Sequence, residues 1–193
     1  MMRMGKKAEM GVGTLIVFIA MLLVAAIAAG VLITTVTSLQ QKALNTGQES
    51  KGEISTHVQF VEISGQDGSD GSFDNFTAIG KLAAGSDPVN LNNVLVSLSL
   101  SDATSNLRYN STADITNYAN KGYFNVTYQV EGAEFREGFI TRGDVITLTM
   151  IPPRNVSEDE LVHITLIPQV GTQSVVEFRT PSVISRQTMT LFP

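Results

Sequence analysis

The chain has 193 residues, with 13 lysines and arginines against 18 aspartates and glutamates, so its formal net charge is −5. That length suffices for one ordinary domain with its own core and an appendage. Because the chain has no cysteine, disulfide frameworks and thiolate metal sites are excluded, and its mild acidity with scattered basic residues argues against nucleic acid as a partner.

An apolar segment dominates the first fifty residues. No charged side chain occurs between Glu9 and Lys42, and residues 11–33, GVGTLIVFIAMLLVAAIAAGVLI, are almost wholly apolar. A helix of that length can cross a bilayer. The segment is preceded by three basic residues, Arg3, Lys6 and Lys7. Such residues stay in the cytoplasm, so the rest of the chain is expected outside.

Three interpretations fit this segment: a cleaved signal peptide, a permanent single-span anchor, and a prepilin-type helix retained after removal of a short leader. The apolar run is longer than a usual signal-peptide core. Beyond it, the uncharged sequence TTVTSLQQ keeps Val36, Leu39 and Leu44 on roughly one helical face. One helix from about Val12 to Glu49 would be about 57 Å long, more than a membrane needs. A plain anchor and a polymer-core helix both remain consistent with these properties.

A helix that is apolar on every side at its start and one-sided near its end suits the core of a polymer. Neighbouring helices would then bury all faces of the first part, and small residues would let them approach closely. The positions expected to pack in such a core are Gly11, Gly13, Leu15, Phe18, Met21, Leu22, Ala25, Ala29 and Leu32.

The apolar segment followed by LQQKALNTGQES resembles the archaellins, the filament subunits of the archaeal swimming organelle. The GTLIVFIAM run and the LQQKA…TG…S continuation carry the resemblance, which extends to residue 65 or so. It implies a subunit without enzymatic activity, whose helix forms the core of a rotating extracellular fibre on the archaeal cell surface. The β-rich remainder would form the outer wall.

Archaellins are made with a short basic leader, which a membrane peptidase usually removes after a glycine three residues before the first glycine of GxGT. That count places the cut between Ala8 and Glu9, where Ala8 stands in place of the usual glycine. The resemblance therefore implies a leader at 1–8, a filament-core helix at 9–53 and an outer domain at 54–193. The mature chain would have 193 − 8 = 185 residues and a charge of 10 − 18 = −8.

The resemblance also implies partners: further copies of the chain or paralogous archaellins, the prearchaellin peptidase, an assembly ATPase and a membrane platform protein, with transient insertion of the precursor in the membrane. Bacterial type IV pilins resemble this arrangement but typically carry a glutamate at the fifth mature position, where this chain has Gly13. Two alternatives stay open. One is an adhesive pilin of the same assembly class, and the other is a membrane-anchored binding protein or enzyme.

From His57 onward the period of the apolar residues changes to two, which is typical of half-buried strands. The alternating sets are Val94, Val96, Leu98 and Leu100; Phe124, Val126, Tyr128 and Val130; Ile146, Leu148 and Met150; and Val162, Ile164 and Leu166. Loops rich in Gly, Asp, Asn and Ser separate them. Seven to nine short strands predict an antiparallel β-sandwich or small barrel, immunoglobulin-like if the resemblance holds. The expected fold class is α+β.

Four N-glycosylation sequons occur, at Asn75, Asn110, Asn125 and Asn155. Archaellins are commonly N-glycosylated, so N-glycans are the expected modification. Asn125 falls on the polar side of its strand, Asn110 lies in a polar stretch, and Asn155 follows two prolines. We expect these three to be accessible.

Other candidate sites are weaker. Asp67, Asp70 and Asp74 could surround a calcium ion, although their spacing is not that of an EF-hand and a solvated turn is favoured. His57 and His163 stand without a catalytic motif and are interpreted as surface histidines. The acidic run Glu158, Asp159 and Glu160 predicts a solvated turn before the strand at Leu161. We therefore expect no catalytic residue.

Overall fold

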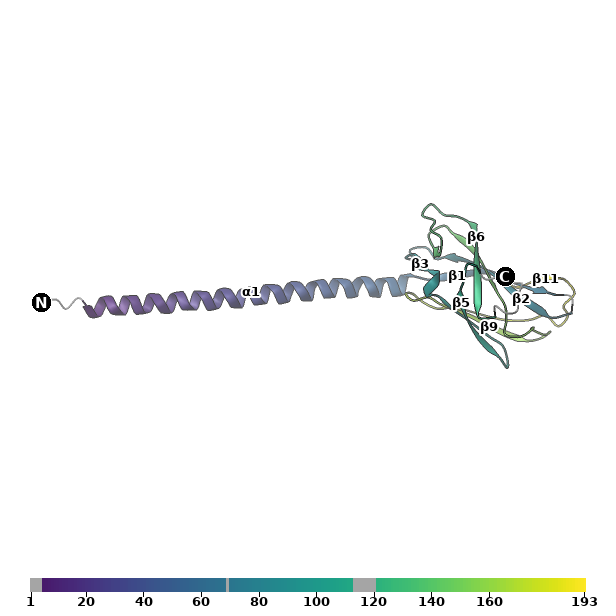
Figure 1. Ribbon diagram of the computed structural model, residues 1–193, viewed down its shortest axis with the longest axis horizontal. Coiled ribbons are helices and arrows are strands. Elements are labelled where there is room, and N and C mark those ends of the chain that lie inside the picture. The colour runs from purple at the N-terminus through teal and green to yellow at the C-terminus, as the bar shows by residue number, and fades with distance from the viewer. Residues whose placement is uncertain (1–4, 69, 113–120) are drawn as a thin grey trace. The chain divides into compact units, whose positions relative to one another are not determined.

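The computed structural model describes residues 5–68, 70–112 and 121–193 (Figure 1). The chain divides into two compact units, Met1–Glu49 and Ser50–Pro193. The first consists of a helix and the second is built almost wholly of β-strands.

Helix α1 runs from Gly5 to Ser55 without interruption, so its axis is about 77 Å long. It contains no proline and is rich in alanine and leucine, which favour the helical backbone. The helix continues six residues beyond Glu49, where the sequence pattern placed its end, and two residues beyond 53, the end of the core helix that the resemblance implied. Its last turn belongs to the second unit, where Gly52 is buried beside Asp87 and Val170. Tertiary packing therefore extends the helix to Ser55.

The second unit contains a nine-stranded sheet in the order β10-β9-β4-β5-β6-β8-β2-β1-β11 and a two-stranded sheet formed by β3 and β7. The strands are β1 (Val58–Asp67), β2 (Phe73–Leu82), β3 (Val89–Asn90), β4 (Leu95–Ser99), β5 (Thr104–Tyr109), β6 (Tyr123–Val130), β7 (Phe139–Ile140), β8 (Val145–Met150), β9 (Leu161–Ile167), β10 (Ser174–Arg179) and β11 (Thr188–Phe192), with a short 3-10 helix η1 at Leu91–Asn93. The described residues thus hold more strands than the seven to nine expected, and β3 and β7 have only two residues each.

The pairing is antiparallel throughout the large sheet except between β5 and β6, which run parallel. This pair departs from the purely antiparallel sheet that the sequence predicted. A parallel neighbour requires the chain to return to its starting edge through a connection longer than a hairpin turn. That connection is residues 110–122, of which 113–120 lie outside the described residues.

The sheet nearly closes on itself. Strand β11 pairs only with Ile63–Gln66 in the second half of β1, so the first half of β1 is open on that side. The segment leading into β10 takes this place, because His57 and Thr172 form a parallel bridge and the Ser174 hydroxyl donates to the Val58 carbonyl. The result is a mostly antiparallel, nearly closed β-domain, as the fold-class prediction required.

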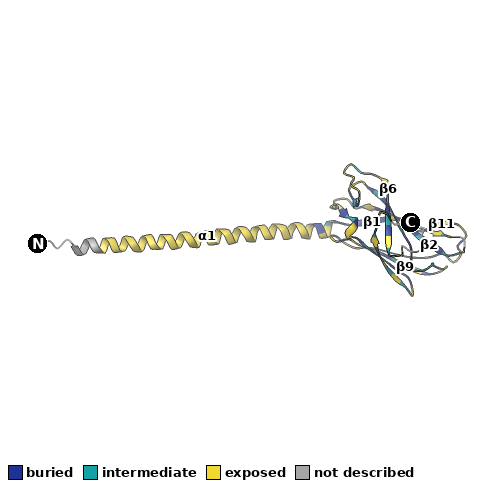
Figure 2. Cartoon of the chain, in the orientation of Figure 1, coloured by how far each residue is buried: buried dark blue, intermediate teal, exposed yellow. Residues whose placement is uncertain are grey.

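The predicted alternation places side chains in the core with one exception. Val94, Val96, Leu98 and Leu100 are buried, as are the apolar sets on β8 and β9 and both Phe124 and Val126 on β6. Val130 is instead 53% exposed, so its assignment to the buried face was wrong. The pairing of β6 with β8 shifts register between Tyr128 and Val130, and such a bulge turns the following side chain to the other face. Figure 2 shows the buried residues within the β-domain.

Candidate functional site: an assembly helix

Helix α1 exposes a long apolar surface. Every side chain from Met10 to Lys51 is exposed, and Figure 2 shows this exposure along the helix. Large apolar residues such as Phe18 and Leu39 are 60% and 66% accessible. Soluble monomers rarely expose a continuous apolar surface of this extent. The helix therefore needs a lipid or protein environment that a single subunit does not supply.

The residues predicted to pack in a filament core all lie on this exposed helix. They are Gly11, Gly13, Leu15, Phe18, Met21, Leu22, Ala25, Ala29 and Leu32. Met10–Ser55 is also long and apolar enough to cross a membrane, judged by length and composition. Ala8 and Glu9, the expected cleavage residues, belong to the first turns of α1, and their side chains lie outside the described part.

Four glycines of α1 occupy positions where no contact within the described part of the subunit requires a small residue. A Cβ atom added at Gly11, Gly13, Gly30 or Gly47 would meet no other described part of the chain within 4 Å. Each glycine inside a helix costs about 1 kcal/mol relative to alanine. Because nothing within the subunit requires this small size, the glycines are suited to contacts that another molecule makes.

Four threonines of α1 bond their hydroxyl groups to carbonyls of the same helix. Thr14 donates to the Gly11 carbonyl at 2.9 Å, Thr35 donates to the Leu32 carbonyl at 2.9 Å, and Thr37 donates to the Ile33 carbonyl at 2.8 Å. Thr34 likewise bonds the Val31 carbonyl. When the hydroxyl of a threonine is bonded within its own helix, its methyl group is the part of the side chain left to contact the surroundings. The polar-looking stretch TTVT therefore tolerates an apolar environment.

The four sequons differ in their surroundings. Asn110 is half-buried, and its side-chain oxygen accepts hydrogen bonds from the Thr112 amide and hydroxyl, both at 3.0 Å. Asn125 on β6 accepts from the Val126 amide at 2.7 Å, and Thr127 of its sequon is exposed. Both asparagines lie near the surface at positions where a sequon can be reached.

The other two sequons are held more tightly. Asn75 lies within β2 and pairs with Gln66 of β1. The side-chain nitrogen of Asn155, the atom that would carry a glycan, donates to Ser72 Oγ at 3.2 Å and to Asp70 Oδ2 at 3.4 Å. Asn155 is half-buried, and its amide connects two loops. Its use as a glycosylation site stays a prediction.

The acidic loop uses its carboxylates as turn acceptors. Asp67 Oδ1 accepts from the amides of Asp70 and Gly71, both at 3.2 Å. Asp70 Oδ1 accepts from the Ser72 hydroxyl at 2.6 Å, and this hydrogen bond lowers the pKa of Asp70. The described residues contain no group of three or more His, Asp or Glu side chains placed to hold a metal ion. Calcium binding by Asp67, Asp70 and Asp74 stays a prediction.

The contacts of the two histidines lie between neighbouring segments of the sheet. His57 Nδ1 lies 3.1 Å from the Thr172 hydroxyl at the start of β1. His163 Nδ1 on β9 lies 3.6 Å from Glu177 Oε2 on β10, and both side chains are over a third exposed. Both contacts connect neighbouring segments of the sheet.

An arginine-centred cluster is the feature that the sequence did not reveal. Arg154 Nη2 lies 2.5 Å from Asp102 Oδ1 and 2.5 Å from Glu160 Oε1, while Arg154 Nη1 donates to Glu160 Oε2 at 3.0 Å. Glu160 also accepts from the Ser101 hydroxyl at 2.9 Å and from the Ser157 amide at 3.2 Å. The cluster joins the turn after β4 to the loop before β9.

The expected solvated turn is therefore wrong for Glu160, which is only 9% exposed. The hydrogen bond from Arg154 lowers its pKa, helped by Ser101 and Ser157 and opposed by burial. Hydrogen bonds to Glu160 and Asp102 raise the pKa of Arg154. Because Glu160 follows two other acidic residues, the sequence predicts that it is solvated. The only local indication of an ion pair is Arg154, six residues earlier.

The exposed helix and the β-domain together match a known protein family. The model of the family described as archaeal-type flagellin matches residues 8–178. The chain belongs to the archaeal-type flagellin family.

Relatives of this flagellin align over nearly its whole length. It is 34% identical to flagellin B2 of Methanocaldococcus jannaschii, covering 92% of this chain and 91% of that protein. It is 33% identical to flagellin B2 of Halobacterium salinarum, over 88% and 86% of the two chains.

Solved structures agree with the fold. The archaeal flagellum of Methanospirillum hungatei matches with a TM-score of 0.69 and 13% identity, covering 95% of this flagellin and 99% of that chain. The crystal structure of the flagellin FlaB1 from M. jannaschii matches with a TM-score of 0.63 and 19% identity, over 71% and 97%.

Family membership fixes the general role. This flagellin is a structural subunit that assembles with its own kind into the helical filament of the archaellum, outside the cell, and it is not an enzyme. The adhesive pilin and the single-span anchored protein are not favoured. The unsatisfied surface of α1 is consistent with this role, because a polymer supplies the contacts that a single subunit lacks.

Proposed function

We propose that the chain is made as a membrane-inserted precursor, is cut between Ala8 and Glu9, and enters the filament with α1 in the core and the β-domain in the outer wall. The observation that carries this proposal is the complete exposure of the uncharged helix from Met10 to Gln41. Such a surface is stable only in lipid or against other protein. The precursor would use the first environment and the filament the second.

The transfer from membrane to filament exchanges lipid for protein around the same side chains. Lipid tails are as apolar as leucine, so hydrophobic burial alone does not favour the exchange. Close packing must supply the gain, and α1 offers Gly11, Gly13 and Gly30 with nothing of the subunit against them. Helices that meet at glycine and alanine approach closely and gain van der Waals contact.

Removal of the leader would act through charge. Residues 1–8 carry the three basic side chains Arg3, Lys6 and Lys7, which hold the start of the helix at the cytoplasmic surface. Burying those charges in a filament core would be costly without partners. Cleavage after Ala8 leaves Glu9 as the only charged side chain before Lys42, so the mature helix can leave the bilayer.

Assembly would depend on other proteins. The sequence has no glycine-rich phosphate loop, and a filament outside the cell has no supply of nucleotide. We infer that a membrane peptidase processes the precursor and that an ATPase with a membrane platform protein drives insertion and rotation. N-glycans would attach first at Asn110, whose sequon includes two exposed residues, and at Asn125, whereas the side-chain nitrogen of Asn155 donates to Ser72.

Mass spectrometry of sheared filaments from cells expressing this chain tests the processing step. We expect a mature N-terminus at Glu9 for the parent chain and for Ala8→Gly, because both side chains at the cut are small. Ala8→Phe should leave the precursor in the membrane fraction. An intact Met1 in assembled filaments would contradict the proposal, and so would normal filaments from the Ala8→Phe chain.

A further inference from the structure

Two of the four sequons meet on neighbouring strands of the β-domain. Strand β5 runs parallel to β6, with Tyr109 opposite Phe124. The Asn110 amide continues this pairing, because it donates to the Phe124 carbonyl at 3.0 Å. The next residue along each strand is a sequon asparagine, so Asn110 and Asn125 lie side by side across the β5–β6 contact. Neighbouring strands are only about 4.8 Å apart.

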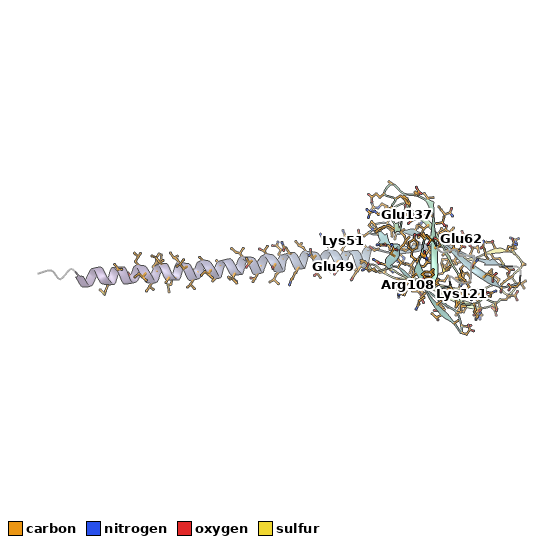
Figure 3. All side chains as sticks on the ribbon, in the orientation of Figure 1. Glu49, Lys51, Glu62, Arg108, Lys121 and Glu137 are labelled. Atoms are coloured by element: carbon orange, nitrogen blue, oxygen red, sulfur yellow. The ribbon has the colours of Figure 1, made fainter. Side chains whose placement is uncertain are left out.

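The two asparagines also face the same side of the sheet. Successive side chains of a strand point to opposite faces. Phe124 is fully buried, and its ring packs against that of Tyr109 with centroids 5.8 Å apart. Asn110 and Asn125, which follow these two residues, are therefore directed to the outer face. Figure 3 labels Arg108, which lies on β5 shortly before this pair.

A glycan on one asparagine crowds the other. An N-glycan is a bulky group whose first sugar ring is bonded directly to the side-chain nitrogen. A sugar ring with its hydroxyl groups is wider than the spacing between two strands. A first glycan on either asparagine therefore occupies the space above its neighbour, and the enzyme and sugar donor of a second transfer must enter that same space.

The local structure favours Asn110 as the acceptor. Its side-chain oxygen accepts from the amide and the hydroxyl of Thr112, both at 3.0 Å, in a turn where Ser111 and Thr112 are exposed. Its Nδ2 takes no part in these two bonds. The Asn125 sequon instead lies within β6 and pairs with β8 at each of its three positions. An enzyme can reach an exposed turn without opening the sheet, whereas the strand is held in place.

The transfer requires one side-chain nitrogen from the chain and a sugar carried on a lipid phosphate. The asparagine Nδ2 attacks the anomeric carbon of the sugar, so that a C–N bond forms and the C–O bond to the phosphate breaks. The phosphate leaves with that electron pair, and one proton passes from Nδ2 to a base of the transferring enzyme. A lipid-bound donor suits a chain that acts outside the cell, where no nucleotide is supplied.

We propose that Asn110 and Asn125 are alternative acceptors of one N-glycan, so that a subunit carries it on one asparagine and not on both. Asn110 is the preferred acceptor. This inference rests on the proposed function, which places glycans at these sequons, and adds that occupancy of one excludes occupancy of the other. Each subunit then presents a single glycan at the β5–β6 contact.

A glutamate-specific protease gives a direct test, because no glutamate lies between Glu62 and Glu131. The released fragment carries Asn110 and Asn125 on one piece, and the substitution Asn75→Gln removes its third sequon. Mass spectrometry of this fragment from sheared filaments counts zero, one or two glycans. Independent sites would give a doubly modified fraction equal to the product of the two single occupancies. We expect a fraction at least about tenfold below that product.

Single substitutions in this background identify the preferred asparagine. Asn110→Gln should raise the occupancy of Asn125 by at least about twofold, because the competing glycan is gone. Asn125→Gln should leave the occupancy of Asn110 nearly unchanged. The matched control combines Asn125→Gln with Asp102→Asn, which creates a sequon with Thr104 on the same fragment. Asp102 is exposed and precedes the other end of β5, so the doubly modified fraction should there equal the product.

Subunits that carry both glycans as often as the product predicts would overturn the exclusion and leave glycosylation itself intact. An unchanged occupancy of Asn125 in Asn110→Gln would overturn it as well. The same holds if the control shows as few doubly modified fragments as the parent, because the exclusion would then not depend on the β5–β6 contact. If Asn110 and Asn125 are unmodified in every variant, both this inference and the proposed glycosylation are wrong.

Discussion

Replacing Glu160 by alanine removes the carboxylate that holds the arginine-centred cluster together. The variant loses two contacts with Arg154 and those from the Ser101 hydroxyl and the Ser157 amide. Hydrogen bonds to a charged group contribute about 1.5–3 kcal/mol each when isolated, and an abandoned partner adds its own cost. Arg154 keeps Asp102 and is 35% exposed, so water and the remaining carboxylate offset part of this loss. We expect a destabilisation of about 2 kcal/mol.

The stabilisation that Glu160 provides depends on pH. The pKa of Glu160 is lowered from its ordinary value of 4.5, so the folded state binds its proton less readily than the unfolded state. The stabilisation is therefore complete above that ordinary value and is lost as the pH falls through the lower folded value. The difference between parent and Glu160→Ala should be full at pH 7 and should shrink on acidification below pH 4.5.

Thermal unfolding of the full chain in non-ionic detergent measures this difference. The chain has four tyrosines and no tryptophan, so near-ultraviolet circular dichroism of the tyrosines reports the β-domain separately from α1. A loss of 2 kcal/mol corresponds to a decrease in Tm of about 4–8 °C for a domain of this size. Asp102→Asn is the matched control, since Asp102 contacts the same arginine from an exposed position and should matter much less.

Two results would refute this reasoning. If Glu160→Ala unfolds within 1 °C of the parent at pH 7, the carboxylate does not stabilise the loop before β9. If Asp102→Asn is as damaging as Glu160→Ala, the cluster depends on the net charge around Arg154 and not on the buried carboxylate.

Three further substitutions test the packing of the β-domain by the same unfolding measurement. Phe76→Ala empties a fully buried site between Phe73 and Phe178, with ring centroids at 6.1 and 5.9 Å, and should cost about 3–5 kcal/mol; a loss below about 1 kcal/mol would contradict this packing. Gly171→Ala places a Cβ atom 2.5 Å from the Thr56 carbonyl at a φ of +119° and should cost about 2–4 kcal/mol, more than Gly85→Ala, whose Cβ is free of contacts. Val130→Thr should change stability by less than about 0.5 kcal/mol, whereas Val126→Thr should cost more because Val126 is buried; equal effects would contradict the bulge.

The helix was predictable because its cause is local. An uninterrupted apolar sequence without proline, much longer than a strand, favours a helix. Its end was predicted at Glu49 from the pattern and at 53 from the resemblance, both before Ser55, since Gly52 packs beside Asp87 and Val170. No property of residues 50–55 alone indicates that contact.

The strands were predictable from alternation, but their neighbours were not. Period two identifies the buried face of β4, β8 and β9 from residues within each strand. The parallel contact of β5 with β6 and the closure of β10 onto β1 involve residues far apart in sequence, and the bulge before Val130 depends on register with β8. Glu160 was misjudged for the same reason, because one of its partners, Ser101, is 59 residues away.

In the proposed assembly, α1 leaves the membrane to become the core of the filament. Cryo-electron microscopy of filaments sheared from cells that express this chain tests it most directly. We expect helical density from Glu9 to about Ser55 around the filament axis, with the β-domain outside. Filaments that lack this chain, or whose core is formed by β-strands with α1 exposed, would contradict the claim.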